Sequence, residues 1–331
     1  MADELETNLK QAQEAEQKGD FFSAAHFYKV ALNIAKNLND SEKIKFIKPK
    51  LLEASQKSTS QFKTISVEQK IPTEEIDDFI GKLLPHELDA IFYVIGMSKN
   101  FCPLSDRIKE TANKSVPIAY HIANVSIISD TGHLISGSDD PQKHWYWQTY
   151  GFSQEIMTNL LLCKVFYQLQ ESGRLTKDSL LKFIASMGLI PDDQLKILNV
   201  ALERYFAKDF VSALHILIPQ FESFFLAASE KFGIDIISLN RTKEISTQPR
   251  TLGQAHLDTA EFQEVWGKDL CEQIKFILFE PLGYKLRHRI AHGEIKFGES
   301  NYQTTTLMIY LFLTVCSRRI KQLADAEAKK D

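Results

Sequence analysis

Cysteine, glycine and proline are all scarce in this chain of 331 residues, which contains 4 Cys, 14 Gly and 10 Pro. No two cysteines have the CxxC spacing, so the sequence predicts neither a zinc site of that type nor a disulfide framework. The scarcity of glycine and proline leaves long uninterrupted segments, many with apolar residues at helical spacing. The composition therefore predicts a mainly α-helical protein.

Long apolar runs and a large excess of one charge are also missing. The longest wholly apolar run, Leu307–Leu313, is too short to cross a bilayer. The segment Met1–Lys18 is polar and has no apolar signal region. The net charge of −4 argues against non-specific binding to long duplexes, which depends on neutralising many phosphates. We therefore expect a cytoplasmic protein with no membrane contact and at most a small basic site.

Residues 1–60 have the pattern of a helical hairpin, with apolar residues at helical spacing on both sides of Gly19-Asp20. The fragment Lys18–Leu32 resembles the middle of one tetratricopeptide repeat. A single repeat cannot bury its own apolar face, so a two-helix cap packed on the next segment is favoured over a peptide-binding groove. Residues 54–70, rich in Ser, Gln, Lys and Thr, are predicted to be a linker.

Residues 61–190 predict a mainly helical middle domain with at most one small β-hairpin, turning at Asp130–Gly132. The aromatic group at His144–Trp147 has the composition for stacking on bases, but packing in a core is the commoner role and is favoured. Residues 191–331 predict an α-helical bundle, in which 233–256 are expected to be a loop.

Two features of this bundle bear on function. Gln220 and Glu222 follow Pro219 inside a long apolar helix, one on each flank of its apolar stripe. They either border the core, or at least one of them reaches the region of Arg287. The run Leu307–Leu313 is apolar almost all round, which indicates either a central helix or the face of a dimer.

The segment Tyr284–Gly293 has the clearest chemical pattern. Arg287 offers a planar fork of donors that matches a phosphate, and His292 can give and take protons near neutral pH. The two side chains lie on different faces of a regular helix, so they converge only if the helix ends near His292, an end that Gly293 suits. Such an arrangement suits in-line attack at a phosphodiester, with His292 transferring protons and Arg287 stabilising the developing charge.

Two other interpretations of this segment stay open. His288 and His292 have the spacing of two metal ligands on one helical face, but Arg289 stands where the zincin pattern needs Glu. We therefore expect no metal and no cofactor. The second alternative is a basic, solvent-facing helix end that is favourable to the helix dipole.

Four blocks in sequence order extend the pattern: Arg204-Tyr205-Phe206, Leu217-x-Pro219-Gln220-x-Glu222, Thr251-Leu252-Gly253 and Leu286-Arg287-x-x-x-Ala291-His292-Gly293. Together they resemble an uncharacterised prokaryotic family whose shared block is similar to the HEPN superfamily, named for higher eukaryotes and prokaryotes nucleotide-binding. The resemblance covers roughly residues 195–325, and four blocks in order are more specific than the spacing of Arg and His alone.

The resemblance implies an all-α bundle, usually a homodimer, and a metal-independent endoribonuclease that acts on RNA. It also implies a toxin–antitoxin or anti-phage defence setting, with an antitoxin or a defence-system protein as partner. Arg287 and His292 would be catalytic, with His288, Gln220 and Glu222 in support; this chain has His288 where the pattern commonly has Asn. Some HEPN proteins are not nucleases, so the alternative is a non-catalytic nucleotide-binding or protein-interaction module.

Overall fold

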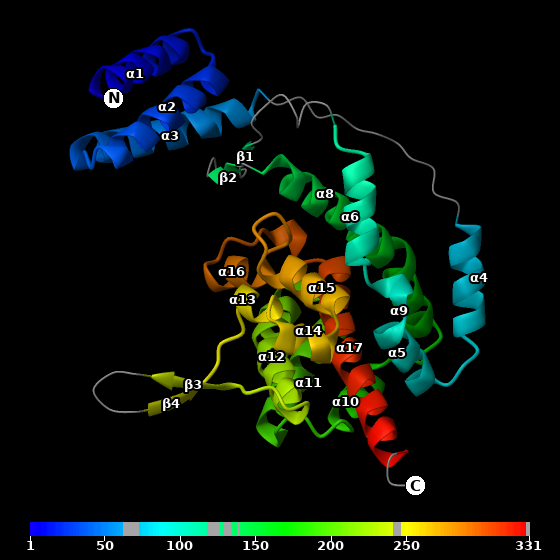
Figure 1. Ribbon diagram of the computed structural model, residues 1–331. Coiled ribbons are helices and arrows are strands. Elements are labelled where there is room, and N and C mark those ends of the chain that lie inside the picture. Colours follow the sequence, from blue (N-terminus) through cyan, green and yellow to red (C-terminus); the bar gives the residue numbers. More distant parts are fainter. Residues whose placement is uncertain (62–72, 118–125, 129–133, 138–139, 241–245, 329–331) are drawn as a thin grey trace. The chain divides into compact units, whose positions relative to one another are not determined.

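A computed structural model describes residues 1–61, 73–117, 126–128, 134–137, 140–240 and 246–328. The chain divides into two compact units (Figure 1). The smaller unit comprises Met1–Ile71 with Pro117–His144, and the larger unit comprises Pro72–Val116 with Trp145–Asp331. Helices dominate the described parts of the chain, so the predicted mainly α-helical fold is confirmed.

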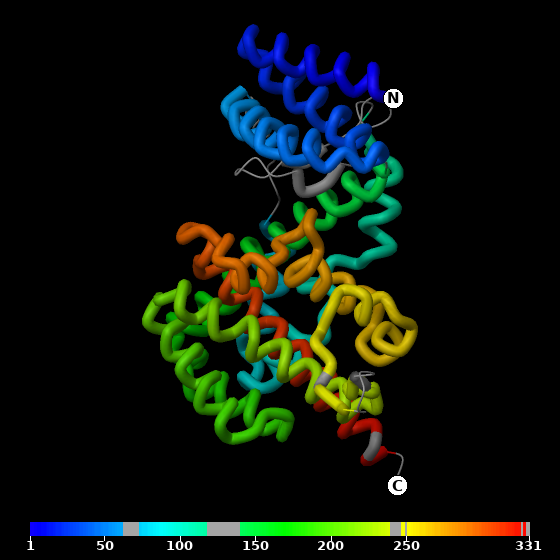
Figure 2. Tube along the Cα trace, turned by 90° about the vertical axis from the view of Figure 1, so that its left-hand side faces the viewer, coloured from blue at the N-terminus to red at the C-terminus, as the bar shows by residue number. Residues whose placement is uncertain are grey.

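The smaller unit contains three helices that pack side by side, drawn in blue in Figure 2: α1 (Ala2–Gln17), α2 (Phe21–Asn37) and α3 (Ser41–Thr59). Asp20 and Asp40 cap α2 and α3, each accepting a backbone N–H at 3.0 Å. Buried small residues, such as Ala12, Ala24 and Ala31, allow close approach of the helices. The predicted helical hairpin over the first two helices is confirmed.

The predicted linker over residues 54–70 is wrong for its first part. Residues 54–59 continue α3, because Ala54 and Ser58 are buried against the other two helices and hold the segment in helical form. Residues 62–70 lie outside the described part of the chain. The predicted β-hairpin is present as β1 (Ser126–Ile128) paired antiparallel with β2 (Leu134–Gly137), while its turn is outside the described residues.

The larger unit is a bundle of helices around one hydrophobic core. Its helices are α4 (Glu74–Leu83), α5 (Leu88–Met97), α6 (Ser105–Lys114), α8 (Pro141–Ile156, with Trp145 onward in this unit), α9 (Cys163–Glu171), α10 (Lys177–Ala185), α11 (Asp192–Phe206), α12 (Phe210–Lys231), α13 (Gln254–Leu257), α14 (Ala260–Trp266), α15 (Lys268–Leu278), α16 (Leu286–Ala291) and α17 (Tyr302–Glu327), with the 3-10 turns η1 (Lys99–Phe101) and η3 (Phe297–Glu299) and the π-helix η2 (Met157–Leu162). This core contains side chains from helices on both sides of residue 190, where the sequence predicted the boundary between the middle domain and the bundle.

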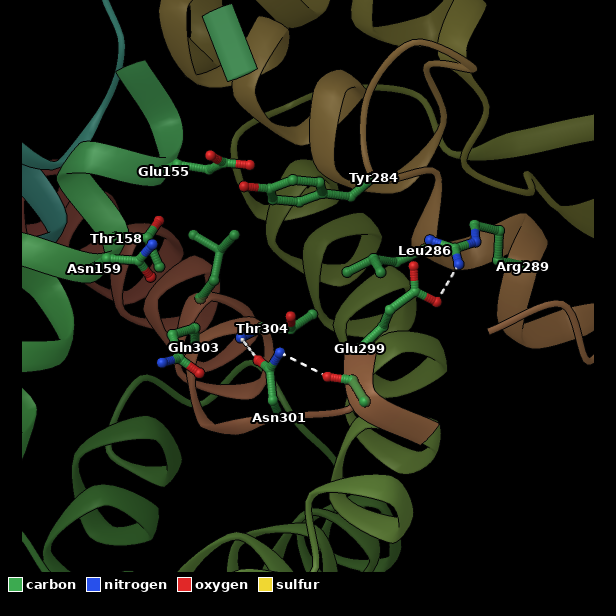
Figure 3. A pocket seen from close by; sticks show the side chains of 12 residues that line it. Glu155, Thr158, Asn159, Tyr284, Leu286, Arg289, Glu299, Asn301, Gln303 and Thr304 are labelled. Carbon is green, nitrogen blue, oxygen red and sulfur yellow. Dashed lines mark hydrogen bonds and ion pairs between the residues drawn. The ribbon is translucent and has the colours of Figure 1, made fainter. Parts of the chain in front are cut away.

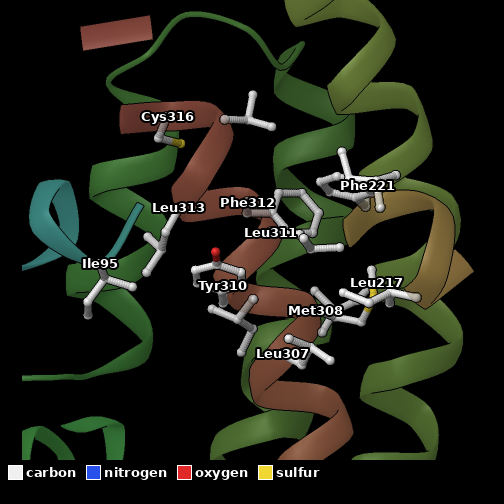
Figure 4. Packing of buried hydrophobic residues seen from close by; sticks show 14 of the residues in the cluster. Ile95, Leu217, Phe221, Leu307, Met308, Tyr310, Leu311, Phe312, Leu313 and Cys316 are labelled. Atoms are coloured by element: carbon white, nitrogen blue, oxygen red, sulfur yellow. The ribbon is translucent and has the colours of Figure 1, made fainter. Parts of the chain in front are cut away.

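The central element of the larger unit is α17, which packs against α5, α9, α10 and α12. Every residue of Leu307–Leu313 is at most 1% exposed. Figure 4 shows Phe312 beside Phe221 of α12, and the two ring centroids are 5.4 Å apart. The run is therefore the middle of a central helix, and it does not provide an apolar face for a dimer.

The crossing of α5 and α17 is close because of a glycine. A Cβ atom built on Gly96 would lie 2.2 Å from the Ser317 hydroxyl oxygen and 2.6 Å from the Leu313 carbonyl oxygen. In the absence of that atom, the Ser317 hydroxyl donates to the carbonyl of Phe92 at 3.2 Å. Small residues at such contacts allow two helix backbones to approach.

Two local predictions for the larger unit had different outcomes. Trp147 is 3% exposed and stacks on Phe276 with centroids 5.8 Å apart, as expected for a core role. The loop predicted over 233–256 is wrong in part, because β3 (Ile237–Asn240) pairs antiparallel with β4 (Ser246–Pro249). This hairpin is additional to the predicted one, and its turn lies outside the described residues.

Among the described residues, α12 is the one helix long and apolar enough to cross a membrane by length and composition. The core helix of a soluble protein passes the same test. Here ten residues of α12 are buried, and the helix packs against α11, α16 and α17. The apolar stripe along this helix therefore serves the core of the larger unit.

Candidate functional site

The motif segment forms the short helix α16 and the turn that ends it. Lys285, which precedes the helix, has a left-handed φ of +50°, and Gly293 after it has a φ of +67°. His292 is the C-cap residue, and its backbone N–H donates to the carbonyl of His288 at 3.0 Å. The predicted helix end at His292 and Gly293 is therefore confirmed, and glycine fits the left-handed position without steric cost.

Glu222 of α12 holds the guanidinium of Arg287. Arg287 Nε donates to Glu222 Oε2 at 2.7 Å, and Arg287 Nη2 donates to Glu222 Oε1 at 3.3 Å. The side chain of Glu222 is 18% exposed and that of Arg287 is 36% exposed. This forked pair fixes the orientation of the guanidinium and uses two of its five N–H donors, which leaves others for a ligand.

The same carboxylate also receives a backbone contact from a third part of the chain. The N–H of Leu252 donates to Glu222 Oε1 at 2.9 Å. The ring of Phe279 lies under Arg287, with its centroid 5.7 Å from Arg287 Cζ. The blocks around Glu222, Leu252 and Arg287, separated by about thirty residues or more, therefore meet at one carboxylate.

Gln220 does not join this cluster. Among the described residues its side chain forms no hydrogen bond, in contrast to Glu222 two positions later. The two positions are about 200° apart around a helix axis, so one faces α16 and the other does not. Of the two candidates next to Pro219, the structure brings only Glu222 to Arg287.

The two imidazoles of the motif lie against each other. The ring centroids of His288 and His292 are 4.2 Å apart, and His288 Nε2 is 3.6 Å from Glu294 Oε1. His292 is exposed and His288 is half-buried. Among the described residues, no group of three or more His, Cys, Asp or Glu side chains has an arrangement that could hold a metal ion.

The environment of His288 favours its neutral form. Burial lowers the pKa of His288, and the positive charges of Lys285 and of protonated His292 lower it further, while Glu294 opposes them. A neutral His288 can accept a proton or a hydrogen bond, and it does not add charge beside Arg287. The site therefore combines a fixed cation with at least one imidazole that is largely unprotonated at neutral pH.

A cavity of about 410 Å³ adjoins the same helix (Figure 3). Leu286 and Arg289 of α16 line it, together with residues of α8, of η2 and of the first turn of α17. Arg289 pairs with Glu299 at its edge. The hydroxyl of Tyr284 points toward Glu155 in Figure 3, and burial followed by the charge of Glu155 raises the pKa of Tyr284.

Sequence reasoning missed several residues of this region. Tyr284 begins the motif segment, Glu294 directly follows it, and Leu252 lies in one of the four blocks. Their positions in the sequence could therefore have marked all three as candidates for the site. Glu155 and Asn159 come from a segment more than 120 residues before the motif, and no spacing in the sequence links them to it.

The cluster of Glu222, Arg287, His288 and His292 contains groups that could act on a phosphate. A carboxylate-oriented guanidinium, followed on the same short segment by two imidazoles in contact, has the groups needed to bind a phosphate and transfer protons at it. None of the protein-family models, characterised proteins or solved structures compared with this chain matches it.

Proposed function

We propose that this protein is a metal-independent endoribonuclease of the HEPN type. The observation that supports this most directly is the forked Glu222–Arg287 pair at 2.7 and 3.3 Å, in the first turn of the short helix that His292 caps. Three of the four blocks that resemble the family meet at this pair. A fixed guanidinium and an exposed imidazole on one short segment are the minimum that in-line cleavage of RNA requires, because RNA supplies its own nucleophile.

In the proposed reaction, His292 removes the proton from a ribose 2′-hydroxyl, and the 2′-oxygen attacks phosphorus. The bond between the 2′-oxygen and phosphorus forms, and the bond from phosphorus to the 5′-oxygen breaks. Arg287, held by Glu222, stabilises the charge that develops on the phosphoryl oxygens. A second acid donates a proton to the leaving 5′-oxygen, which gives a 2′,3′-cyclic phosphate and a 5′-hydroxyl.

A homodimer would supply the second acid. The rings of His288 and His292 contact each other at 4.2 Å, so within one chain they cannot lie on opposite sides of one phosphate. A two-fold axis beside the motif would bring a second His292 to the other side, because an isologous interface presents the same patch twice. In this arrangement His288 positions the phosphate or the neighbouring imidazole.

The test is incubation of the purified protein with total RNA in the presence of EDTA, beside the variants Arg287→Ala and His292→Ala. We expect cleavage by the unsubstituted protein, products that end in a 2′,3′-cyclic phosphate, and a loss of at least about a hundredfold in each variant. Cleavage that stops with EDTA and returns with zinc or manganese would refute metal independence. Light scattering at micromolar concentration tests the dimer.

Complete absence of cleavage, together with binding of nucleotides, would favour the alternative of a non-catalytic nucleotide-binding module. An antitoxin or another defence-system protein is the partner class that fits a regulated ribonuclease. Expression of the active protein should arrest cell growth, whereas expression of the Arg287→Ala variant should not. Equal growth with both forms would count against the proposed toxin–antitoxin or anti-phage role.

A further inference from the structure

The cavity beside α16 has features that the proposed cleavage reaction does not use. Its floor contains the buried side chains of Leu286 and Leu307, and its rim presents Glu155, Asn159 and Gln303. Among the described residues, Glu155 forms no ion pair, and Asn159 and Gln303 form no side-chain hydrogen bonds. Figure 3 shows Glu155, Asn159 and Gln303 toward the left of the view, and Glu299 and Arg289 toward the right. Buried apolar side chains together with unpaired polar groups are typical of a small-molecule pocket, and about 410 Å³ is within the usual range.

The charges around the cavity exclude a phosphate as its occupant. Two carboxylates, Glu155 and Glu299, line it, and Arg289, which is already paired with Glu299, supplies the positive charge. The occupant that fits is an uncharged planar group with N–H donors for Glu155 and acceptors for the side-chain amides. A nucleobase has this chemistry, and its sugar and phosphate would remain outside.

We propose that this cavity binds a guanine base of single-stranded RNA, an inference that rests on the proposed action on RNA. Guanine has two adjacent donors, N1–H and N2–H₂, on one edge, and these match the two acceptor oxygens of the Glu155 carboxylate. Its O6 and N7 are acceptors for the amides of Asn159 and Gln303. Cytosine and uracil present the acceptor O2 where guanine presents N2–H₂, and adenine presents the acceptor N1 where guanine presents N1–H. None of the three therefore offers two adjacent donors to the carboxylate.

Two local features support a site for single-stranded nucleic acid at this place. Asn159 belongs to the π-helix η2, and π-helical turns are frequent at functional sites. Phe297 is 86% exposed and directly precedes Gly298, which lines the cavity. An exposed ring at the rim is a platform on which a neighbouring base can stack.

The cavity and the motif are close enough to act on one RNA. Leu286 and Arg289 line the cavity, while Arg287 and His288 belong to the same short helix and His292 caps it. The six residues of α16 span about 9 Å along the axis. A guanine in the cavity and a phosphate at Arg287 can therefore belong to one short stretch of chain, and the cavity would select the position of cleavage.

The test measures binding without cleavage. Five-nucleotide, fluorescein-labelled 2′-O-methyl RNAs, with guanine, adenine or uracil at the centre of a uracil sequence, lack the attacking hydroxyl. Fluorescence anisotropy gives the Kd of each. We expect the guanine RNA to bind about tenfold more tightly than the other two, since one bidentate base contact corresponds to about that discrimination.

The decisive variant is Glu155→Gln, which places an amide donor against the donors of guanine. It should reduce the preference to less than about threefold with an unchanged melting temperature, because Glu155 is exposed. Glu171→Gln makes the same change at an exposed glutamate on α9 that does not line the cavity, and it should keep the preference. Equal affinity for all three RNAs, a preference that survives Glu155→Gln, or no binding at all would overturn the proposal.

Failure of this inference and failure of the nuclease proposal give different results. A guanine preference without cleavage of natural RNA would refute the nuclease and keep the base site. Cleavage of natural RNA without a guanine preference would keep the nuclease and refute the base site. Arg287→Ala should weaken the binding of all three RNAs by the same factor, because its proposed contact is with phosphate.

Discussion

Replacement of Glu222 by glutamine tests whether Glu222 is needed to orient Arg287 for activity or only to stabilise the fold. The carboxylate accepts three hydrogen bonds, at 2.7 and 3.3 Å from Arg287 and at 2.9 Å from the Leu252 amide. Glutamine has nearly the same shape but only one acceptor oxygen. Its NH₂ group must face either the guanidinium or the amide N–H, so one donor meets another donor.

The stability cost of this change is limited by solvent. Fully exposed ion pairs contribute about 0–1 kcal/mol, and hydrogen bonds to charged groups contribute about 1.5–3 kcal/mol when buried. With Glu222 18% and Arg287 36% exposed, the pair lies between these limits, and we expect a loss of about 1–2 kcal/mol. In a unit of this size that corresponds to a fall in Tm of about 2–8 °C.

The effect on the proposed cleavage of RNA should be larger. Without the carboxylate the guanidinium can rotate about its side-chain bonds, and a displacement of about 1 Å at a reacting centre costs about a hundredfold in rate. Cleavage of a labelled RNA under single-turnover conditions measures the rate, and differential scanning calorimetry measures Tm. We expect Glu222→Gln to lose about a hundredfold in rate at a temperature well below its Tm.

A matched control is Asp258→Asn, which breaks a different ion pair in the same unit. Asp258 lies 2.8 Å from Lys275, whose side chain is 14% exposed. This variant should lower Tm by a similar amount and leave the cleavage rate within about twofold, since it does not touch Arg287. If Glu222→Gln loses no more activity than this control, Glu222 is a structural acid and the reasoning on orientation is wrong.

Three other changes test the fold and the site. Leu311→Ala should reduce the free energy of unfolding by about 2–5 kcal/mol in urea titrations and leave the oligomeric state in light scattering unchanged, because Leu311 is 0% exposed inside the core. Gly96→Ala should cost about 1–3 kcal/mol in the same titration, because its methyl group would overlap Ser317. By NMR, the pKa of His288 should lie below its usual 6.5, and it should be lower still in Glu294→Gln; a pKa above 6.5 would contradict the burial argument. Because the pKa is lowered in the folded state, the contribution of His288 to the free energy of unfolding is present above pH 6.5. That contribution is lost as the pH falls from 6.5 through the lowered value.

The sequence alone determined the local structure that depends on neighbours in the chain. The apolar repeats on both sides of Gly19 predicted α1 and α2, because helical spacing is a property of each segment by itself. Gly293 predicted the end of α16, because a left-handed residue at a helix C-terminus favours glycine. The mainly α-helical fold followed from the sum of such local signals.

The tertiary structure decided which side chains meet across long distances in the chain. The sequence presented Gln220 and Glu222 as equal candidates beside Pro219, and only the packing of α12 against α16 brought Glu222 to Arg287. Similarly, the run Leu307–Leu313 predicted burial but not what covers it, since an apolar surface has no preferred partner. The block Thr251-Leu252-Gly253 marked this segment in the sequence but not its contact with Glu222. A backbone N–H is present at almost every residue, and only folding selects which one lies 2.9 Å from a carboxylate.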